Sequence, residues 1–62
     1  MSIFEIVEYI KLKGYECFYD RNWNAFNIYK KDRTSMMIYK PHITSDMVDK
    51  YLSETEEIWE KT

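Results

Sequence analysis

The single glycine and the single proline of this chain limit its fold more than any other feature, because each stands where one pattern of residues gives way to another. Gly14 follows a helical pattern and Pro41 follows an alternating one, so both mark the ends of elements. With no other glycine or proline, flexible linkers and low-complexity segments are excluded. Hydrophobic residues make up 45% of the 62 residues, which is enough for the packed core of one small domain, residues 1–62.

Residues 2–13 carry the signals of an amphipathic helix. Ser2 followed by Glu5 is a capping box, in which each side chain accepts a hydrogen bond from the other residue's backbone N–H. Gly14 supplies the left-handed conformation that ends the helix. The apolar residues recur at helical spacing and form one stripe, which comprises Ile3, Ile6, Val7 and Ile10.

The middle of the chain predicts three strands of an antiparallel meander. The first covers residues 15–19, the second residues 25–30 and the third residues 34–40, with polar turns between them. Pro41 closes the third strand, because it has no N–H to donate to a neighbouring strand.

The length of the second turn decides which strand residues face each other. A three-residue loop at residues 31–33 pairs Ile28 with Met36 and Phe26 with Ile38. The residues then expected on the other face are Tyr29, Met37 and Tyr39. A two- or four-residue loop shifts these pairings.

Residues 45–60 predict a second amphipathic helix, with Thr44 as its N-cap and Ile43 packing onto Val48 across the cap. Its apolar arc comprises Met47, Val48, Tyr51, Leu52, Thr55, Ile58 and Trp59. The opposite side is an acidic stripe of Asp46, Asp49, Glu56, Glu57 and Glu60. Because each helix has one apolar stripe, we expect both to pack on one face of the sheet, in an α+β domain of order α-β-β-β-α.

An enzymatic function is not expected from the residues present. Cys17 and His42 are the only candidate nucleophile and base, and no nucleophile motif surrounds either of them. One cysteine and one histidine also exclude a disulfide framework and a zinc site within one chain. No glycine-rich phosphate loop is present, so we expect no cofactor and no metal.

Cellular location is indicated by three features. The longest apolar run is residues 36–39, far below the ~20 residues of a membrane helix. Glu5 and Glu8 lie near the N-terminus, which has no basic region typical of a secretory signal. The lone Cys17 fits a reducing compartment. We therefore expect a cytoplasmic protein without a membrane partner.

Charge is segregated along the chain although the net charge is only −2. Residues 21–40 hold five basic residues and one acidic residue, whereas residues 42–62 hold six acidic residues and two basic ones. The acidic helix is either a solvated face or a mimic of a phosphate backbone that binds a protein's nucleic-acid groove. Trp23, in a polar turn, either folds onto the core or anchors a partner.

The basic middle suggests a different partner. Aromatic rings on an open sheet face stack on bases while neighbouring cations hold phosphates, which predicts binding of single-stranded nucleic acid. The residues for this alternative are Arg21, Tyr29, Lys30, Lys31, Arg33, Tyr39 and Lys40. Tyrosine and lysine are equally typical of half-exposed strands. Tyr9 and Leu12 lie off the buried stripe of the first helix, and together with an open sheet face they favour a homodimer.

The order of elements resembles the double-stranded-RNA-binding-domain fold and, within it, the HicA-type mRNA interferase toxins. In those toxins the first helix ends in glycine and an aromatic residue, as at Gly14 and Tyr15 here, and a Gly-Ser-His segment then leads to a phenylalanine. This chain has Asn22-Trp23-Asn24-Ala25-Phe26 there, so only Phe26 matches and the catalytic histidine is missing. The resemblance therefore implies a fold, and a degenerate RNA-binding domain at most.

The chain is also similar in length and order of elements to small phage anti-CRISPR proteins, which block a CRISPR nuclease with an acidic surface. That resemblance and the acidic helix lead to our first hypothesis, a non-enzymatic interaction protein of a phage or mobile element that inhibits a host nucleic-acid-handling protein. Its candidate contacts are Asp46, Asp49, Glu56, Glu57, Glu60 and Trp23.

Overall fold

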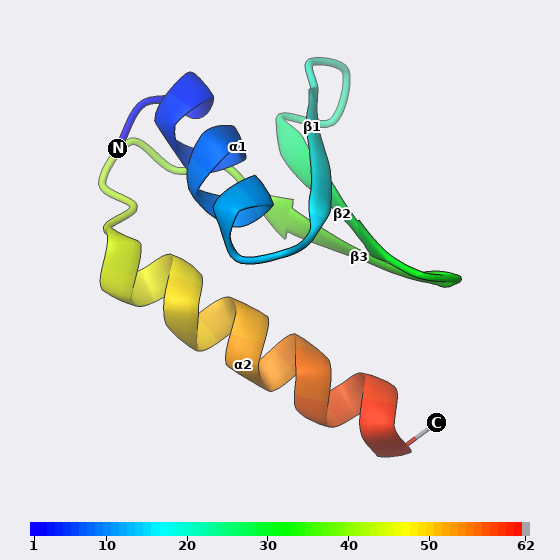
Figure 1. The fold of residues 1–62 in the computed structure, drawn as a ribbon. Coiled ribbons are helices and arrows are strands. Elements are labelled where there is room, and N and C mark those ends of the chain that lie inside the picture. The colour runs from blue at the N-terminus through cyan, green and yellow to red at the C-terminus, as the bar shows by residue number, and fades with distance from the viewer. Residues whose placement is uncertain (62) are drawn as a thin grey trace.

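The computed structural model describes residues 1–61 and has the expected α+β architecture. Two helices pack against a three-stranded antiparallel sheet in which the strands lie in the order β1-β2-β3 (Figure 1). The elements are α1 (Ile3–Leu12), β1 (Glu16–Asp20), β2 (Ala25–Lys30), β3 (Arg33–Ile38) and α2 (Ser45–Lys61).

The ends of α1 form as the sequence predicts. The Ser2 N–H donates to Glu5 Oε1 at 2.8 Å, and the Glu5 N–H donates to Ser2 Oγ at 3.1 Å, which completes the capping box. At the other end Gly14 has a φ of +99°, a conformation that side chains rarely adopt. Its N–H donates to the Lys11 carbonyl at 3.0 Å and closes the last turn.

The β2–β3 loop has two residues rather than three, so the pairings expected from a three-residue loop are wrong. Lys30 pairs with Arg33 across the loop, and Phe26 faces Met37 instead of Ile38. Lys31, the first loop residue, has a φ of 59°, as the first position of a tight two-residue hairpin turn requires. Ile28 consequently faces Ser35 instead of Met36.

The corrected register moves two residues to the other face of the sheet. Met37 is buried in the core, and Tyr39 packs edge-on against Phe26 with ring centroids 6.0 Å apart. Both were expected to share the outer face with Tyr29, which does lie there, stacked on Phe18. A shift of one residue reverses every side chain along a strand, which explains why both moved together.

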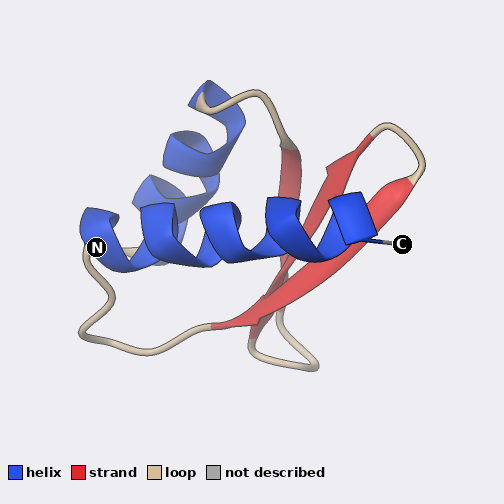
Figure 2. Cartoon of the chain, turned by 90° about the horizontal axis from the view of Figure 1, so that it is seen from below, coloured by secondary structure: helices blue, strands red, loops and turns tan. Residues whose placement is uncertain are grey.

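Both helices cover the same face of the sheet, as Figures 1 and 2 show. The core cluster joins side chains from α1, from the inner face of all three strands and from α2. Its members are Ile6, Ile10, Tyr15, Cys17, Phe26, Ile28, Met37, Ile43, Val48 and Leu52. Within residues 1–61, no other element covers the opposite face of the sheet.

α2 begins at the predicted cap and lies along the free edge of β3. The Met47 N–H donates to Thr44 Oγ1 at 3.3 Å. Further along, the Tyr51 hydroxyl donates to the Met36 carbonyl at 2.5 Å and Trp59 Nε1 donates to the Thr34 carbonyl at 3.2 Å. These bonds use carbonyls of an edge strand that would otherwise be open to another strand.

Not all of the predicted apolar arc of α2 is buried. Val48, Leu52 and Thr55 are buried, but Met47 is 42% exposed and Ile58 is 62% exposed. The three-stranded sheet is narrow, and the part of α2 that it covers is smaller than the predicted apolar arc of this helix.

Candidate interaction surfaces

The five acidic residues of the predicted stripe divide into two groups in the structure. Asp49 and Glu56 are half-buried and make contacts within the chain, whereas Asp46, Glu57 and Glu60 are exposed. Asp49 and Glu56 are seven residues apart and so lie on the same side of α2, the side that faces the rest of the domain.

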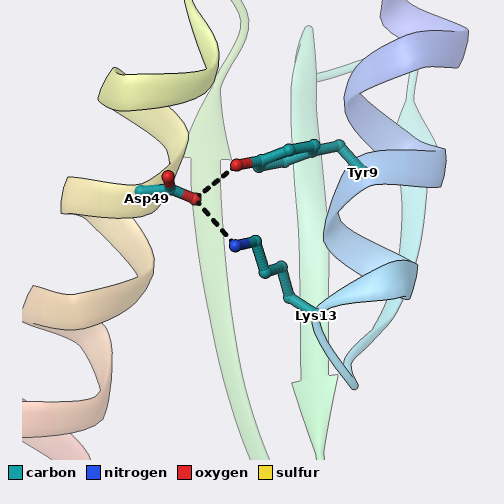
Figure 3. A network of polar contacts seen from close by, with 3 residues as sticks. All are labelled: Tyr9, Lys13 and Asp49. Atoms are coloured by element: carbon teal, nitrogen blue, oxygen red, sulfur yellow. Dashed lines mark hydrogen bonds and ion pairs between the residues drawn. The ribbon is translucent and has the colours of Figure 1, made fainter.

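Asp49 links the two helices through the contacts drawn in Figure 3. The Tyr9 hydroxyl donates to Asp49 Oδ1 at 2.8 Å, and Lys13 Nζ lies 3.5 Å from the same oxygen. The hydrogen bond to Asp49 raises the pKa of Tyr9, and the negative charge of Asp49 raises the pKa of Lys13. Tyr9, which lies off the apolar stripe, is therefore a contact between helices.

Glu56 makes the corresponding contact with the sheet. Lys30 Nζ lies 3.6 Å from Glu56 Oε1 and 5.0 Å from the centre of the Tyr15 ring. Burial, with the charge of Glu56 as a smaller cause, raises the pKa of Tyr15. Asp49 and Glu56 thus help to hold α2 against the domain, and their charges are already balanced by Lys13 and Lys30.

The exposed carboxylates of α2 have no such partners. Asp46, Glu57 and Glu60, together with Glu54, make no ion pair within residues 1–61. Three of them fall within six residues, a rise of about 9 Å along the helix. We call Glu54, Glu57 and Glu60 the acidic end of α2. The helical pattern in the sequence places Asp46, Glu57 and Glu60 in the acidic stripe but does not include Glu54, because Glu54 lies between the acidic stripe and the apolar arc.

The position of the acidic end is unfavourable for the helix itself. The C-terminal end of a helix carries a partial negative charge, which favours basic side chains there. α2 has Lys61 in its last turn, and the Arg33 guanidinium donates to the Trp59 carbonyl from β3. Glu60 lies in this last turn, and Lys61 and Arg33 offset part of the charge there.

The basic residues predicted to bind nucleic acid lie at opposite ends of the sheet. Lys30, Lys31 and Arg33 surround the β2–β3 loop and border a cleft of about 220 Å³ that also contains Glu56 and Glu60. Arg21 lies in the β1–β2 turn at the other end, where Lys40 follows β3. They therefore do not form one continuous basic surface.

The two predicted stacking tyrosines are also separated, since Tyr29 lies on the outer face of the sheet and Tyr39 on the inner face. Tyr39 contacts Tyr19 and Phe26 at centroid distances of 6.3 and 6.0 Å. Tyr29 stacks on Phe18 at 5.7 Å. Only Tyr29 is placed where a base could stack against the open sheet.

Trp23 is exposed, with 68% of its surface accessible, in a turn that is well anchored. The Asn22 N–H donates to Asp20 Oδ1 at 2.9 Å, and the Tyr39 N–H donates to the Asn24 carbonyl at 2.9 Å. This turn is at the end of the sheet away from the β2–β3 loop, whereas the acidic end of α2 lies beside that loop (Figure 1).

The structure keeps Cys17 and His42 in different environments. Cys17 is buried in the core, and this burial raises the pKa of its thiol to about 11, which disfavours the reactive thiolate. His42 is exposed in the loop before α2. Within residues 1–61 no group of three or more histidine, cysteine, aspartate or glutamate side chains is arranged to hold a metal ion. In that same part of the chain, neither helix is long and apolar enough to cross a bilayer.

The fold and its surfaces define a small α+β domain with one acidic helix end and one uncovered sheet face. Comparison of the chain with protein-family models, with curated proteins and with solved structures finds no match.

Proposed function

We propose that this protein is a non-enzymatic interaction module that binds a basic, nucleic-acid-handling partner protein through the acidic end of α2. The observation that carries the proposal is the set of exposed carboxylates at Glu54, Glu57 and Glu60, which have no ion-pair partner in the described part of the chain. By occupying a groove that normally receives phosphates, they would inhibit the partner. A phage or mobile-element origin fits such an inhibitor.

Two features of the helix support this function. First, Asp49 and Glu56 already make the ion pairs that attach α2 to the domain, so the three exposed glutamates are not needed for attachment. Second, Glu60 lies in the last turn of α2, where the helix dipole disfavours negative charge, and a position that costs stability is more simply explained by binding than by folding. The rest of the helix provides a rigid support, because Leu52 and Thr55 are buried beneath it.

The proposal is tested with a variant that removes the three charges without shortening the side chains: Glu54→Gln, Glu57→Gln and Glu60→Gln together. The matched control replaces three exposed carboxylates elsewhere: Glu8→Gln, Asp32→Asn and Asp46→Asn. Immobilised wild type and both variants are incubated with nuclease-treated bacterial lysate. Bound proteins are then eluted with added single-stranded DNA.

We expect the wild type and the control to retain a protein that DNA displaces, and the acidic-end variant to lose it. The acidic-end variant should melt at the same or a slightly higher temperature than the wild type, because the repulsion from the helix dipole is removed. Equal retention by all three proteins, or a retained protein that DNA does not displace, would overturn the proposal.

The alternative, binding of single-stranded nucleic acid by the basic residues, has less support from their positions. Lys30 is paired with Glu56, and the cleft beside Lys31 also contains Glu60, so a phosphate there would meet two carboxylates. Capture that is lost when the lysate is treated with nuclease would favour this alternative.

A further inference from the structure

The outer face of the sheet exposes an apolar patch that no other part of the described chain covers. Phe18 is 48% exposed, Met36 46% and Ile38 53%, and Tyr29 stacks on Phe18. Single exposed apolar residues are common, but here they come from all three strands of one sheet face.

The register places this outer face in three rows across the strands β1, β2 and β3. The middle row is Phe18, Asn27 and Met36. The row nearest the β2–β3 loop is Glu16, Tyr29 and Thr34. The row nearest the β1–β2 turn is Asp20, Ala25 and Ile38, of which Ala25 is fully buried.

The charges on this face are unequally shared between the two edge strands. Glu16 and Asp20 lie on β1, whereas Lys40 follows β3 and borders a groove at the β3 edge with Ile38 and Tyr51. None of these three residues makes an ion pair within residues 1–61. One edge of the face is therefore acidic and the other is basic.

Because the two edges differ, only one of the simple two-fold arrangements of two such faces is favourable. An axis across the strands places β1 on β1 of the second copy, so that Glu16 of each copy approaches Asp20 of the other. An axis along β2 places β1 on β3 instead. Phe18 then meets Met36, and Asp20 lies within reach of Lys40.

We propose that the protein forms a symmetric dimer through this face, with the two-fold axis running along β2. The two sheets pack face to face as in a β-sandwich. Phe18 and Met36 of opposite copies form aromatic–sulfur contacts, and Asp20 of each copy pairs with Lys40 of the other. The two Asn27 side chains meet at the axis, where their amides are able to hydrogen-bond to each other.

The face suits a second copy better than a nucleic acid. Phosphates would meet Glu16 and Asp20 on the face itself, which opposes binding of a polyanion there. The second copy, by contrast, supplies the opposite charge at each edge. The area is small, about 15 by 17 Å for three strands of this length, so we expect a dimer that forms at high micromolar concentration.

Sedimentation equilibrium over about 20 µM to about 1 mM measures this association directly. The wild type should change from monomer to dimer over this range. Met36→Lys should remain monomeric, because it places two charges in the centre of the interface. The control Leu12→Lys adds a charge at an exposed position of α1, where the side chain is 86% exposed, and should dimerise as the wild type does.

A charge exchange tests the direction of the axis. Asp20→Lys and Lys40→Asp each place like charges opposite each other, and each variant alone should dimerise about tenfold more weakly. An equimolar mixture of the two restores both attractive pairs and should form mixed dimers with the affinity of the wild type. Because only folded chains form the mixed dimer, this result also shows that both variants fold.

Three outcomes would overturn the proposal. They are a wild type that stays monomeric at about 1 mM, a dimer that Met36→Lys leaves intact, and a mixture that associates no better than its components. None of them bears on the acidic end of α2, whose variants leave the sheet face unchanged.

Discussion

Alkaline pH should destabilise this protein through Cys17, whose thiol is 5% exposed in the core. Burial raises the pKa of the thiol from its ordinary value of 9.0 to about 11. The unfolded chain therefore loses this proton at a lower pH than the folded chain does. The stabilising contribution is complete below about pH 9 and is lost as the pH rises, so that at about pH 11 the unfolding free energy has fallen by about 2 kcal/mol.

The assay is urea unfolding of the wild type and of Cys17→Ala at a series of pH values from about 7 to about 11, under reducing conditions. The alanine variant is less stable at every pH, because it lacks the buried sulfur atom. It also lacks the titrating group, so the difference in unfolding free energy between the two proteins should shrink by about 2 kcal/mol between about pH 8.5 and about pH 11. Tyrosines and lysines titrate in both proteins and cancel in that difference.

Parallel pH profiles for the two proteins would refute this reasoning. They would mean that the thiol ionises as easily in the folded chain as in the unfolded one, which is incompatible with its burial beside Ile28. Ultraviolet titration of the thiolate in the folded wild type gives an independent check, with a midpoint expected near pH 11.

Three further predictions concern local features. Gly14→Ala should lower the unfolding free energy by about 1 kcal/mol, because the φ of +99° disfavours any side chain although nothing lies within 4 Å of the added carbon; unchanged stability in urea would contradict this. Lys31→Gly should raise the same quantity by about 0.5–1 kcal/mol by relieving the φ of 59°, and a lower melting temperature would exclude that cause. Asp49→Asn should lower the pKa of Tyr9 toward its ordinary value in a spectrophotometric titration, whereas an unchanged midpoint would mean that Asp49 does not hold the phenol.

The helix ends and the order of elements were predictable because their signals are local. The capping box needs only Ser2 and Glu5, three residues apart, and the structure contains both of its hydrogen bonds. Gly14 and Thr44 act in the same way, each through a backbone group within three residues. Such contacts form within one turn of chain, so the rest of the fold does not alter them.

The register of β2 with β3 was not predictable, because the turn sequence Lys31-Asp32-Arg33 contains no glycine or asparagine to fix its length. A two-residue loop leaves Arg33 in β3 and shifts every pairing by one residue. That shift buried Met37 and exposed Met36 on the outer face. The apolar patch of Phe18, Met36 and Ile38 therefore became visible only with the structure.

The roles of the acidic residues of α2 were hidden for another reason. Helical spacing places Asp49 and Glu56 on the polar side, but their partners come from distant parts of the chain. Lys13 lies 36 positions before Asp49, and Lys30 lies 26 positions before Glu56. The spacing of residues within one helix does not show which cations from distant parts of the chain approach it. The helical pattern therefore did not distinguish among the five carboxylates.

The two proposed surfaces lie on opposite sides of the molecule, and this arrangement has a consequence for binding. Because both helices pack on the inner face of the sheet, a dimer through the outer face leaves both copies of α2 pointing away from the interface (Figure 2). Such a dimer would present two acidic ends. A partner with two basic grooves within reach of both would bind the dimer with higher avidity than it binds a monomer. Met36→Lys, which prevents dimerisation but leaves Glu57 and Glu60 in place, should then weaken capture of a two-site partner without changing capture of a one-site partner.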